Sequence, residues 1–365
     1  MRVALLELAR KPGRFAIAGV ALTLLSLLLL FLGALLDGLF LNSTGAIRAH
    51  DADAVVFSSD ARQSFLRSSI DAGTRAGVEA AVGDGEVGGL GISLLGVVIP
   101  GEAEIADGAV IGYELASSTL PEPPGPGQAH ADRRLEDFGA ELGQTVLVGP
   151  AAVPLELVDW VEDTNYLLQG GLWVEPGTWR SVQNQNRPDD PVGDEEFQAL
   201  VVRVVEPRPD LESSIDSTVG VTESLSQDEA VFAVPGITEQ ERTFTAVIGV
   251  TVFVAGLVVA LFFALLTIER QGLYAVLKAV GASDRILVLG VVVQAIVVAV
   301  GAFAIGLVAT LAMARVLPPT VPAQFELGRG VYTLVALVAA SVLGALISLR
   351  RIIRIDPASA IGAGV

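Results

Sequence analysis

A histidine-based metal site in this sequence would need carboxylates to complete it, because the chain has two histidines. The two histidines, His50 and His130, lie far apart along the chain. Asp51 and Asp53 follow His50 closely enough to complete a metal site, because carboxylates and imidazoles are both zinc ligands. Alternating aspartates beside a strand more often form a solvated face. The sequence therefore predicts no metal site here.

Motifs that bind nucleotides or activate a nucleophile are missing. No GxxxxGK[ST] phosphate loop, GxSxG turn or HExxH pair occurs in the 365 residues. A chain without a phosphate loop is not expected to hydrolyse ATP, and no catalytic residue is predicted. Cysteine is absent as well, which excludes disulfides and thiolate metal sites.

Four long runs without a charged side chain predict four transmembrane helices. A crossing helix needs about 20 apolar residues at roughly 1.5 Å each, and a soluble helix of that length usually carries charges on its outer face. The first run is longer than the core of a signal peptide, and no convincing small-x-small cleavage site follows it, so an uncleaved anchor is expected. The predicted spans are 15–36, 243–268, 286–314 and 331–349.

The basic residues predict which segments face the cytoplasm. Lysine and arginine gather in segments 1–14, 269–285 and 350–365, and such segments stay on the cytoplasmic side of a cell membrane. Segment 37–242 instead holds 36 acidic residues against 11 arginines, a net charge of −25. We expect it outside the cell, together with a short loop at 315–330. Its acidity disfavours nucleic acid as a partner.

Segment 37–242 is long enough for a core of its own. A helix is predicted over Gln63–Val82, and strands are predicted where apolar or alternating runs of strand length occur between Pro- and Gly-rich loops. The predicted fold class is an α-helical membrane protein with four transmembrane helices plus an external mixed α+β domain. The predicted strands are Ala54–Phe57, Gly91–Ile99, Thr145–Val148, Leu155–Val161, Leu200–Val205 and Ala230–Val234.

A short amphipathic helix is predicted between the second and third spans. Its apolar residues fall at i, i+3, i+4 and i+7 and form one face. Gly281 suits the end of this helix, and Lys278 sits in the last turn, where the helix dipole favours a cation. The pattern alone leaves open whether the apolar face lies among lipid headgroups or contacts a cytoplasmic partner.

The same segment, ERQGLYAVLKAVGAS at 269–283, resembles the cytoplasmic coupling segment of FtsX-like permeases, the membrane subunits of MacB-type ABC transporters. RIIRIDPASAIG at 351–362 resembles the closing motif of that family, and residues 8–24 and 142–149 are similar to its first span and external domain. The resemblance implies a homodimer with a separate ATP-binding subunit that carries ATP and magnesium. The implied coupling residues are Glu269, Arg270, Leu273, Val276, Leu277, Lys278 and Val280.

Within that family, VVFSSDARQSF at 55–65 and VPGITEQERTF at 234–244 look most like the haem-exporter branch. The resemblance implies that haem or another amphipathic compound enters from the outer leaflet, near the external ends of the spans. Two glutamates at that depth are also explained as helix N-terminal carboxylates that the dipole stabilises. The candidate substrate residues are Asn42, Glu239, Glu241 and Met313.

Three functions fit these observations. The first is a permease that expels a hydrophobic or amphipathic compound. The second is a mechanotransmitting subunit that uses the partner's ATP hydrolysis to activate an external cell-wall hydrolase. The third is a sensor or adhesin anchored by its spans, which leaves the amphipathic cytoplasmic helix unexplained.

Overall fold

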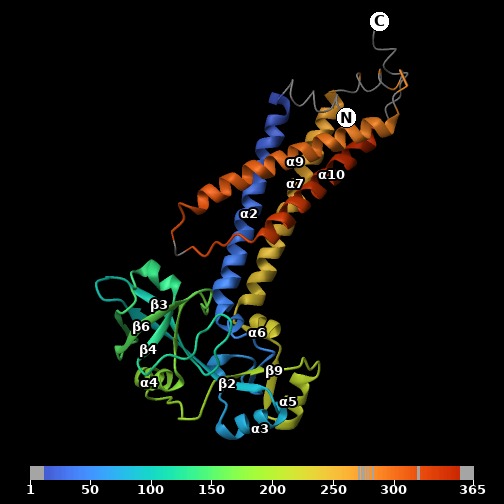
Figure 1. Cartoon of the computed structure of the whole chain (residues 1–365). Coiled ribbons are helices and arrows are strands. Elements are labelled where there is room, and N and C mark those ends of the chain that lie inside the picture. Colours follow the sequence, from blue (N-terminus) through green and yellow to red (C-terminus); the bar gives the residue numbers. More distant parts are fainter. Residues whose placement is uncertain are drawn as a thin grey trace. The chain divides into compact units, whose positions relative to one another are not determined.

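The described part of this chain contains four long helices and one α+β domain. The computed structural model describes residues 12–269, 272, 276, 278, 280–281, 283–318 and 321–353. The contacts divide the chain into a helical unit, which runs up to Gly38 and resumes at Glu241, and a second unit at Leu39–Gln240 (Figure 1). The helices long and apolar enough to cross a membrane are α2 (Pro12–Arg48), α7 (Ile237–Glu269), α9 (Asp284–Ala314) and α10 (Leu327–Ile353).

Three of these helices extend well beyond the charge-free runs that predict them. Helix α2 continues through Asp37 to Arg48, α7 begins at Ile237, and α10 begins at Leu327, inside the segment expected as a short loop. The backbone hydrogen bonds of a helix continue past a charged residue, whereas the apolar run ends there. The prediction of four transmembrane helices is confirmed.

Small residues allow the helices to pack closely. The face of α9 that carries Ala295, Ala299, Ala302 and Gly306 is buried. A Cβ atom added to Gly306 would lie 2.8 Å from Oγ of Ser26 in α2, so the two helices touch where that side chain is missing. Small side chains at this face therefore let α9 and α2 pack closely.

The second unit is built on one sheet of nine strands. Neighbouring strands are hydrogen-bonded in the order β3-β7-β4-β6-β5-β2-β8-β1-β9. A further pairing of β3 with β2 closes six of these strands into a ring. The prediction of a mixed α+β domain is confirmed. The strands are β1 (Ala54–Ser58), β2 (Glu86–Val98), β3 (Ile105–Tyr113), β4 (Gln128–Asp132), β5 (Thr145–Val148), β6 (Val153–Val161), β7 (Gly170–Val174), β8 (Ala199–Arg203) and β9 (Thr222–Leu225).

Strand β2 is one of the six strands of the ring and also pairs with β8, which lies outside the ring. Its first residues pair with β8, and the rest pair with β3 along their whole length. Gly91 of β2 lies opposite Gly112 of β3, and Trp179 of α4 (Pro176–Asn186) occupies the space that these glycines leave. Helices α3 (Ala72–Val82) and α5 (Leu211–Val219) pack in a separate apolar cluster with β1 and β8.

Two of the expected elements differ from the structure. The strand predicted at Ala230–Val234 is wrong, because most of this run lies in α6 (Gln227–Ala233). Ser226 and Glu229 form a reciprocal capping box that starts the helix. The helix predicted over Gln63–Val82 is correct only from Ala72 onward, because Ile70 pairs with Phe197 in an isolated β-bridge.

Candidate functional site

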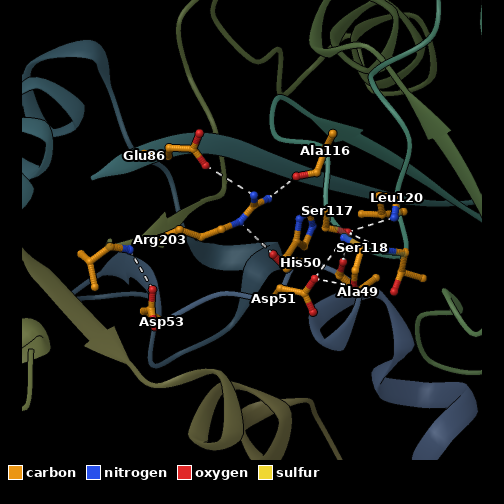
Figure 2. A network of polar contacts seen from close by, with 12 residues as sticks. Ala49, His50, Asp51, Asp53, Glu86, Ala116, Ser117, Ser118, Leu120 and Arg203 are labelled. Carbon is orange, nitrogen blue, oxygen red and sulfur yellow. Dashed lines mark hydrogen bonds and ion pairs between the residues drawn. The ribbon is translucent and has the colours of Figure 1, made fainter. Parts of the chain in front are cut away.

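The C-terminal end of α2 is held inside the α+β domain by Arg203 of β8. Its Nε atom donates to the main-chain oxygen of His50 at 3.1 Å, and its Nη2 atom donates to the oxygen of Ala116 at 2.5 Å (Figure 2). Its Nη1 atom lies 3.4 Å from a carboxylate oxygen of Glu86. One planar guanidinium therefore ties together the helix end, the loop after β3 and the start of β2.

The loop at 116–120 also binds the helix end. Ser117 Oγ donates to the main-chain oxygen of Ala49 at 2.5 Å and accepts from the backbone of Leu120 (Figure 2). Asp51 has the left-handed φ of 50°, which aspartate tolerates, and its carboxylate accepts from the backbone and hydroxyl of Ser118. These bonds hold the pKa of Asp51 below its ordinary value.

Gln227 links the same helix end to the segment that leads into α7. Its Oε1 atom accepts from the backbone of Ala52 at 2.5 Å, and its Nε2 atom lies 3.5 Å from the oxygen of Arg48. Gln227 begins α6, which is followed after a few residues by α7. We name the set of Ser117, Ser118, Arg203 and Gln227 the helix clamp.

His50 is buried at the centre of the helix clamp. Only 2% of the residue is exposed, and its ring packs against Trp173 with centroids 5.4 Å apart. Among the described residues neither ring nitrogen has a hydrogen-bond partner. Burial, and secondarily the charge of Arg203, lowers the pKa of His50 to about 3. The imidazole is therefore neutral at physiological pH.

The two aspartates near His50 bind the backbone. Asp51 accepts from Ser118, and Asp53 Oδ2 accepts from the backbone of Val204 at 2.7 Å (Figure 2). No group of three or more potential metal ligands occurs in the part of the chain that the structure describes. The two aspartates therefore stabilise the backbone just after the end of α2.

A second polar feature lies within the helical unit. Nε of Arg329, in the first turn of α10, donates to Oδ1 of Asp37 in α2 at 2.5 Å. The Arg329 side chain lies across Gly33 and would collide with a Cβ atom there. The residues before α10 also contact α2, because Gln324 donates its backbone N–H to the oxygen of Ala34 at 2.9 Å. An ionisable pair at this level of a membrane helix marks a functional-site candidate.

An apolar cavity of about 340 Å3 adjoins this ion pair. Asp37, Glu326 and Arg329 are the charged residues that line it. The volume falls at the low end of the range for small-molecule sites, about 300–1,000 Å3. We name it the Asp37 cavity. Its large apolar side chains include Leu30, Phe303, Leu307, Leu311, Phe325 and Leu334.

Sequence reasoning missed Asp37, Arg329 and Arg203 as site residues. A signal for the first two was present, because Asp37 directly follows the first charge-free run and Arg329 closely precedes the last. The sequence gives no sign that they pair with each other. Arg203 stands at the end of an apolar strand and carries no comparable signal.

The predicted coupling residues are only partly described. Glu269 ends α7, and Lys278 Nζ lies 2.8 Å from Oδ1 of Asp284 at the start of α9. Val276 and Val280 are 55% and 83% exposed. The other predicted coupling residues, Arg270, Leu273 and Leu277, lie outside the described residues.

The predicted substrate residues lie in different settings. Asn42 is buried, and its Oδ1 atom accepts from Arg134 at 3.0 Å and from Asn165 at 3.2 Å. Glu239 and Glu241 are exposed near the start of α7, two positions apart, so they point to different faces of the helix. Met313 is half-buried in the last turn of α9.

These features define the class of protein as a membrane protein whose α+β domain is inserted between its first and second transmembrane helices. Residues 245–357 match the model of the FtsX-like permease C-terminal family. The expected resemblance to FtsX-like permeases is therefore confirmed over these residues.

Curated relatives match over a similar length. A Staphylococcus epidermidis protein named as a hemin transport system permease, HrtB, is 27% identical over 111 residues, which cover 30% of this chain and 32% of the relative. An uncharacterized ABC transporter permease of Mycobacterium tuberculosis is 39% identical over 113 residues, with coverage of 30% and 31%. The chain thus matches about a third of the length of these relatives.

Two solved structures resemble the chain weakly. The periplasmic region of MacB from Actinobacillus actinomycetemcomitans gives a TM-score of 0.35 at 12% identity and covers 52% of this chain and 96% of its own. The extracellular domain of YknZ from Gram-positive bacteria gives a TM-score of 0.34 at 10% identity, with coverage of 47% and 98%.

Proposed function

We propose that the chain is the membrane subunit of an FtsX-type ABC transporter and works as a homodimer with a separate ATP-binding subunit. The observation that carries this proposal is the family match over residues 245–357, which includes the segment between α7 and α9. The basic residues of that segment and of both chain ends favour a cytoplasmic location, where the partner would bind ATP and magnesium. The acidic α+β domain would then lie outside.

The surface offered to the ATP-binding subunit includes Val280, which is 83% exposed. An apolar side chain held in water favours contact with a partner or with lipid. Replacing it with aspartate would remove apolar contact area and add a charge to the interface. This single position therefore tests the assignment without a change inside a described helix.

The test is ATPase activity of the purified complex in lipid nanodiscs with Val280→Asp. We expect this variant to lower the ATPase activity that depends on the membrane subunit by at least about tenfold, because a charge placed in an apolar contact costs more than the roughly 1.4 kcal/mol that a tenfold change requires. Val205→Asp is the matched control, since Val205 is 87% exposed in the α+β domain. Unchanged activity in Val280→Asp would contradict the proposal, as would equal losses in both variants.

Expulsion of a hydrophobic or amphipathic compound is the transport function that we propose, with haem as one candidate. Support comes from the relative named for hemin transport. Glu239, Glu241 and Met313 are the residues that we assign to such a ligand, because Asn42 already accepts two hydrogen bonds. Saturable stimulation of ATPase activity by haemin, lost in Glu239→Gln or Glu241→Gln, would support this assignment. A flat response would remove haem as the ligand.

Force transmission to a cell-wall hydrolase is the second candidate. The observation that favours it is the single unbroken helix α2, whose C-terminal end is fixed by the helix clamp. A helix anchored in this way passes its displacement to the domain that holds it. ATP-dependent activation of an added hydrolase, without stimulation by any amphipath, would favour this function over transport.

A further inference from the structure

We propose that the Asp37 cavity binds an amphipath with a primary ammonium head and an alkyl tail. This inference names a ligand class for the proposed permease and so rests on the proposed function. Binding itself is measured on the membrane subunit alone. A failure to bind therefore leaves the partner test with Val280→Asp unaffected.

The first support is an oxygen atom that lacks a partner. Asp37 is 8% exposed, its Oδ1 atom accepts from Arg329, and its Oδ2 atom has no hydrogen bond within the described residues. Buried carboxylate oxygens without a donor are rare, because the lost hydration is not replaced. Asp37 is among the residues that line the cavity, so a molecule that fills the cavity contacts this side chain.

The second support is the charge at the cavity. Asp37 and Glu326 contribute two negative charges and Arg329 contributes one positive charge, which leaves one negative charge uncompensated among the lining residues. An ammonium head supplies both the missing charge and three hydrogen-bond donors. A carboxylate or sulfate head would compete with Asp37 for Arg329 and leave two acidic groups unpaired.

The third support is the apolar wall and its depth. Leu30, Phe303 and Leu307 belong to the helices that form it, and an alkyl chain removes apolar area from water when it fills such a space. Asp37 and Arg329 lie at the ends of the charge-free runs 15–36 and 331–349. Such a position corresponds to the boundary between hydrocarbon and headgroups. The ammonium can come from a free alkylamine or from the headgroup of phosphatidylethanolamine.

The experiment measures equilibrium binding of radiolabelled octylamine to the full-length chain in phosphatidylcholine nanodiscs, with empty discs as the blank. We expect saturable binding that neither octanol nor octanoate displaces. Asp37→Asn removes the charge with little change of shape and should weaken binding by about tenfold. Asp189→Asn, which removes an exposed carboxylate of the α+β domain, is the matched control and should bind as the unaltered chain does.

A second variant protects the test against misfolding of the first. Ala34→Leu places a larger side chain in the wall of the cavity while Asp37 and Arg329 remain, and it should also abolish saturable binding. Discs that contain phosphatidylethanolamine distinguish the two sources of the ammonium group. If this lipid competes with octylamine, the ligand is the lipid headgroup; if it does not compete, the ligand is a free amine. Binding that is non-saturable, equal for octanoate, or unchanged in both variants would overturn the proposal.

Discussion

Arg203 and His50 are joined by a hydrogen bond of 3.1 Å from the guanidinium to the main-chain oxygen, although 153 positions separate them. His50 is the second residue after α2, and Arg203 ends β8, a strand between β2 and β1. The bond therefore fixes the end of a transmembrane helix to an interior strand of the sheet. This relationship makes the helix clamp testable by substitution.

Arg203→Leu should destabilise the α+β domain by about 2 kcal/mol, because the main-chain oxygens of His50 and Ala116 each lose a donor. The measurement is denaturant unfolding of the full-length chain in nanodiscs, followed by tryptophan fluorescence. All three tryptophans lie in this domain. Arg187→Leu, at an exposed position, should change stability little. Equal stability of the Arg203 and Arg187 variants would contradict the role of the clamp.

His50 should make the domain less stable as the pH falls. Its folded-state pKa of about 3 lies below the ordinary value of 6.5, so the unfolded chain takes up a proton that the folded chain does not. The contribution of His50 to the free energy of unfolding is complete above about pH 7 and declines as the pH falls toward about 3. At about pH 5 this free energy is lower by about 2 kcal/mol. His50→Phe keeps a ring against Trp173 and should flatten this dependence. An unchanged pH profile in that variant would refute the assignment to His50.

Gly344→Ala should disrupt packing between α10 and α7. An added Cβ atom would collide with the main-chain oxygen of Gly256 and lie 3.0 Å from the nitrogen of Ala260, and backbone atoms cannot rotate away. We expect the thermal midpoint of the nanodisc-embedded chain, measured by loss of the monodisperse peak on size exclusion, to fall by several degrees. Gly290→Ala in α9 meets no atom and should be neutral or stabilising. A fall in both variants would indicate a general intolerance of alanine.

Arg329→Leu should destabilise the helical unit by about 3 kcal/mol, because Asp37 then remains as a buried charge without its partner. Adding Asp37→Leu to the same chain should recover most of the loss, since an apolar pair avoids the desolvation cost. The same size-exclusion assay compares the single and double variants. A double variant less stable than the single one would show that the ion pair is not the source of the effect.

The strands illustrate what a local pattern predicts and what it does not. Thr145–Val148 matches β5 residue for residue, because its alternation of exposed and buried positions is a property of the strand alone. Strands β3, β4, β7 and β9 were not predicted, and β3 and β7 contain the glycines Gly108, Gly112 and Gly170. Glycine lowers strand propensity, and only the neighbouring strands make these segments stable in the sheet.

The short apolar run at Ala230–Val234 is ambiguous when it is considered without its neighbours. A run of five apolar residues fits a buried strand and a helix equally well. The signal that distinguishes them is the capping box of Ser226 and Glu229, which lies just before the run. Here the sequence held enough information for the correct result.

The sequence by itself determined the four transmembrane helices, the acidic inserted domain and the family resemblance of the C-terminal part. These features depend on continuous apolar runs and short motifs. Their residues are close together in the sequence, so their interaction with a bilayer does not depend on the tertiary fold. Only the tertiary structure decided that Asp37 meets Arg329, 292 positions away, and that Arg203 holds the end of α2. Pairing of distant groups depends on how helices and strands pack. The sequence around each of these residues does not indicate which residue it will contact.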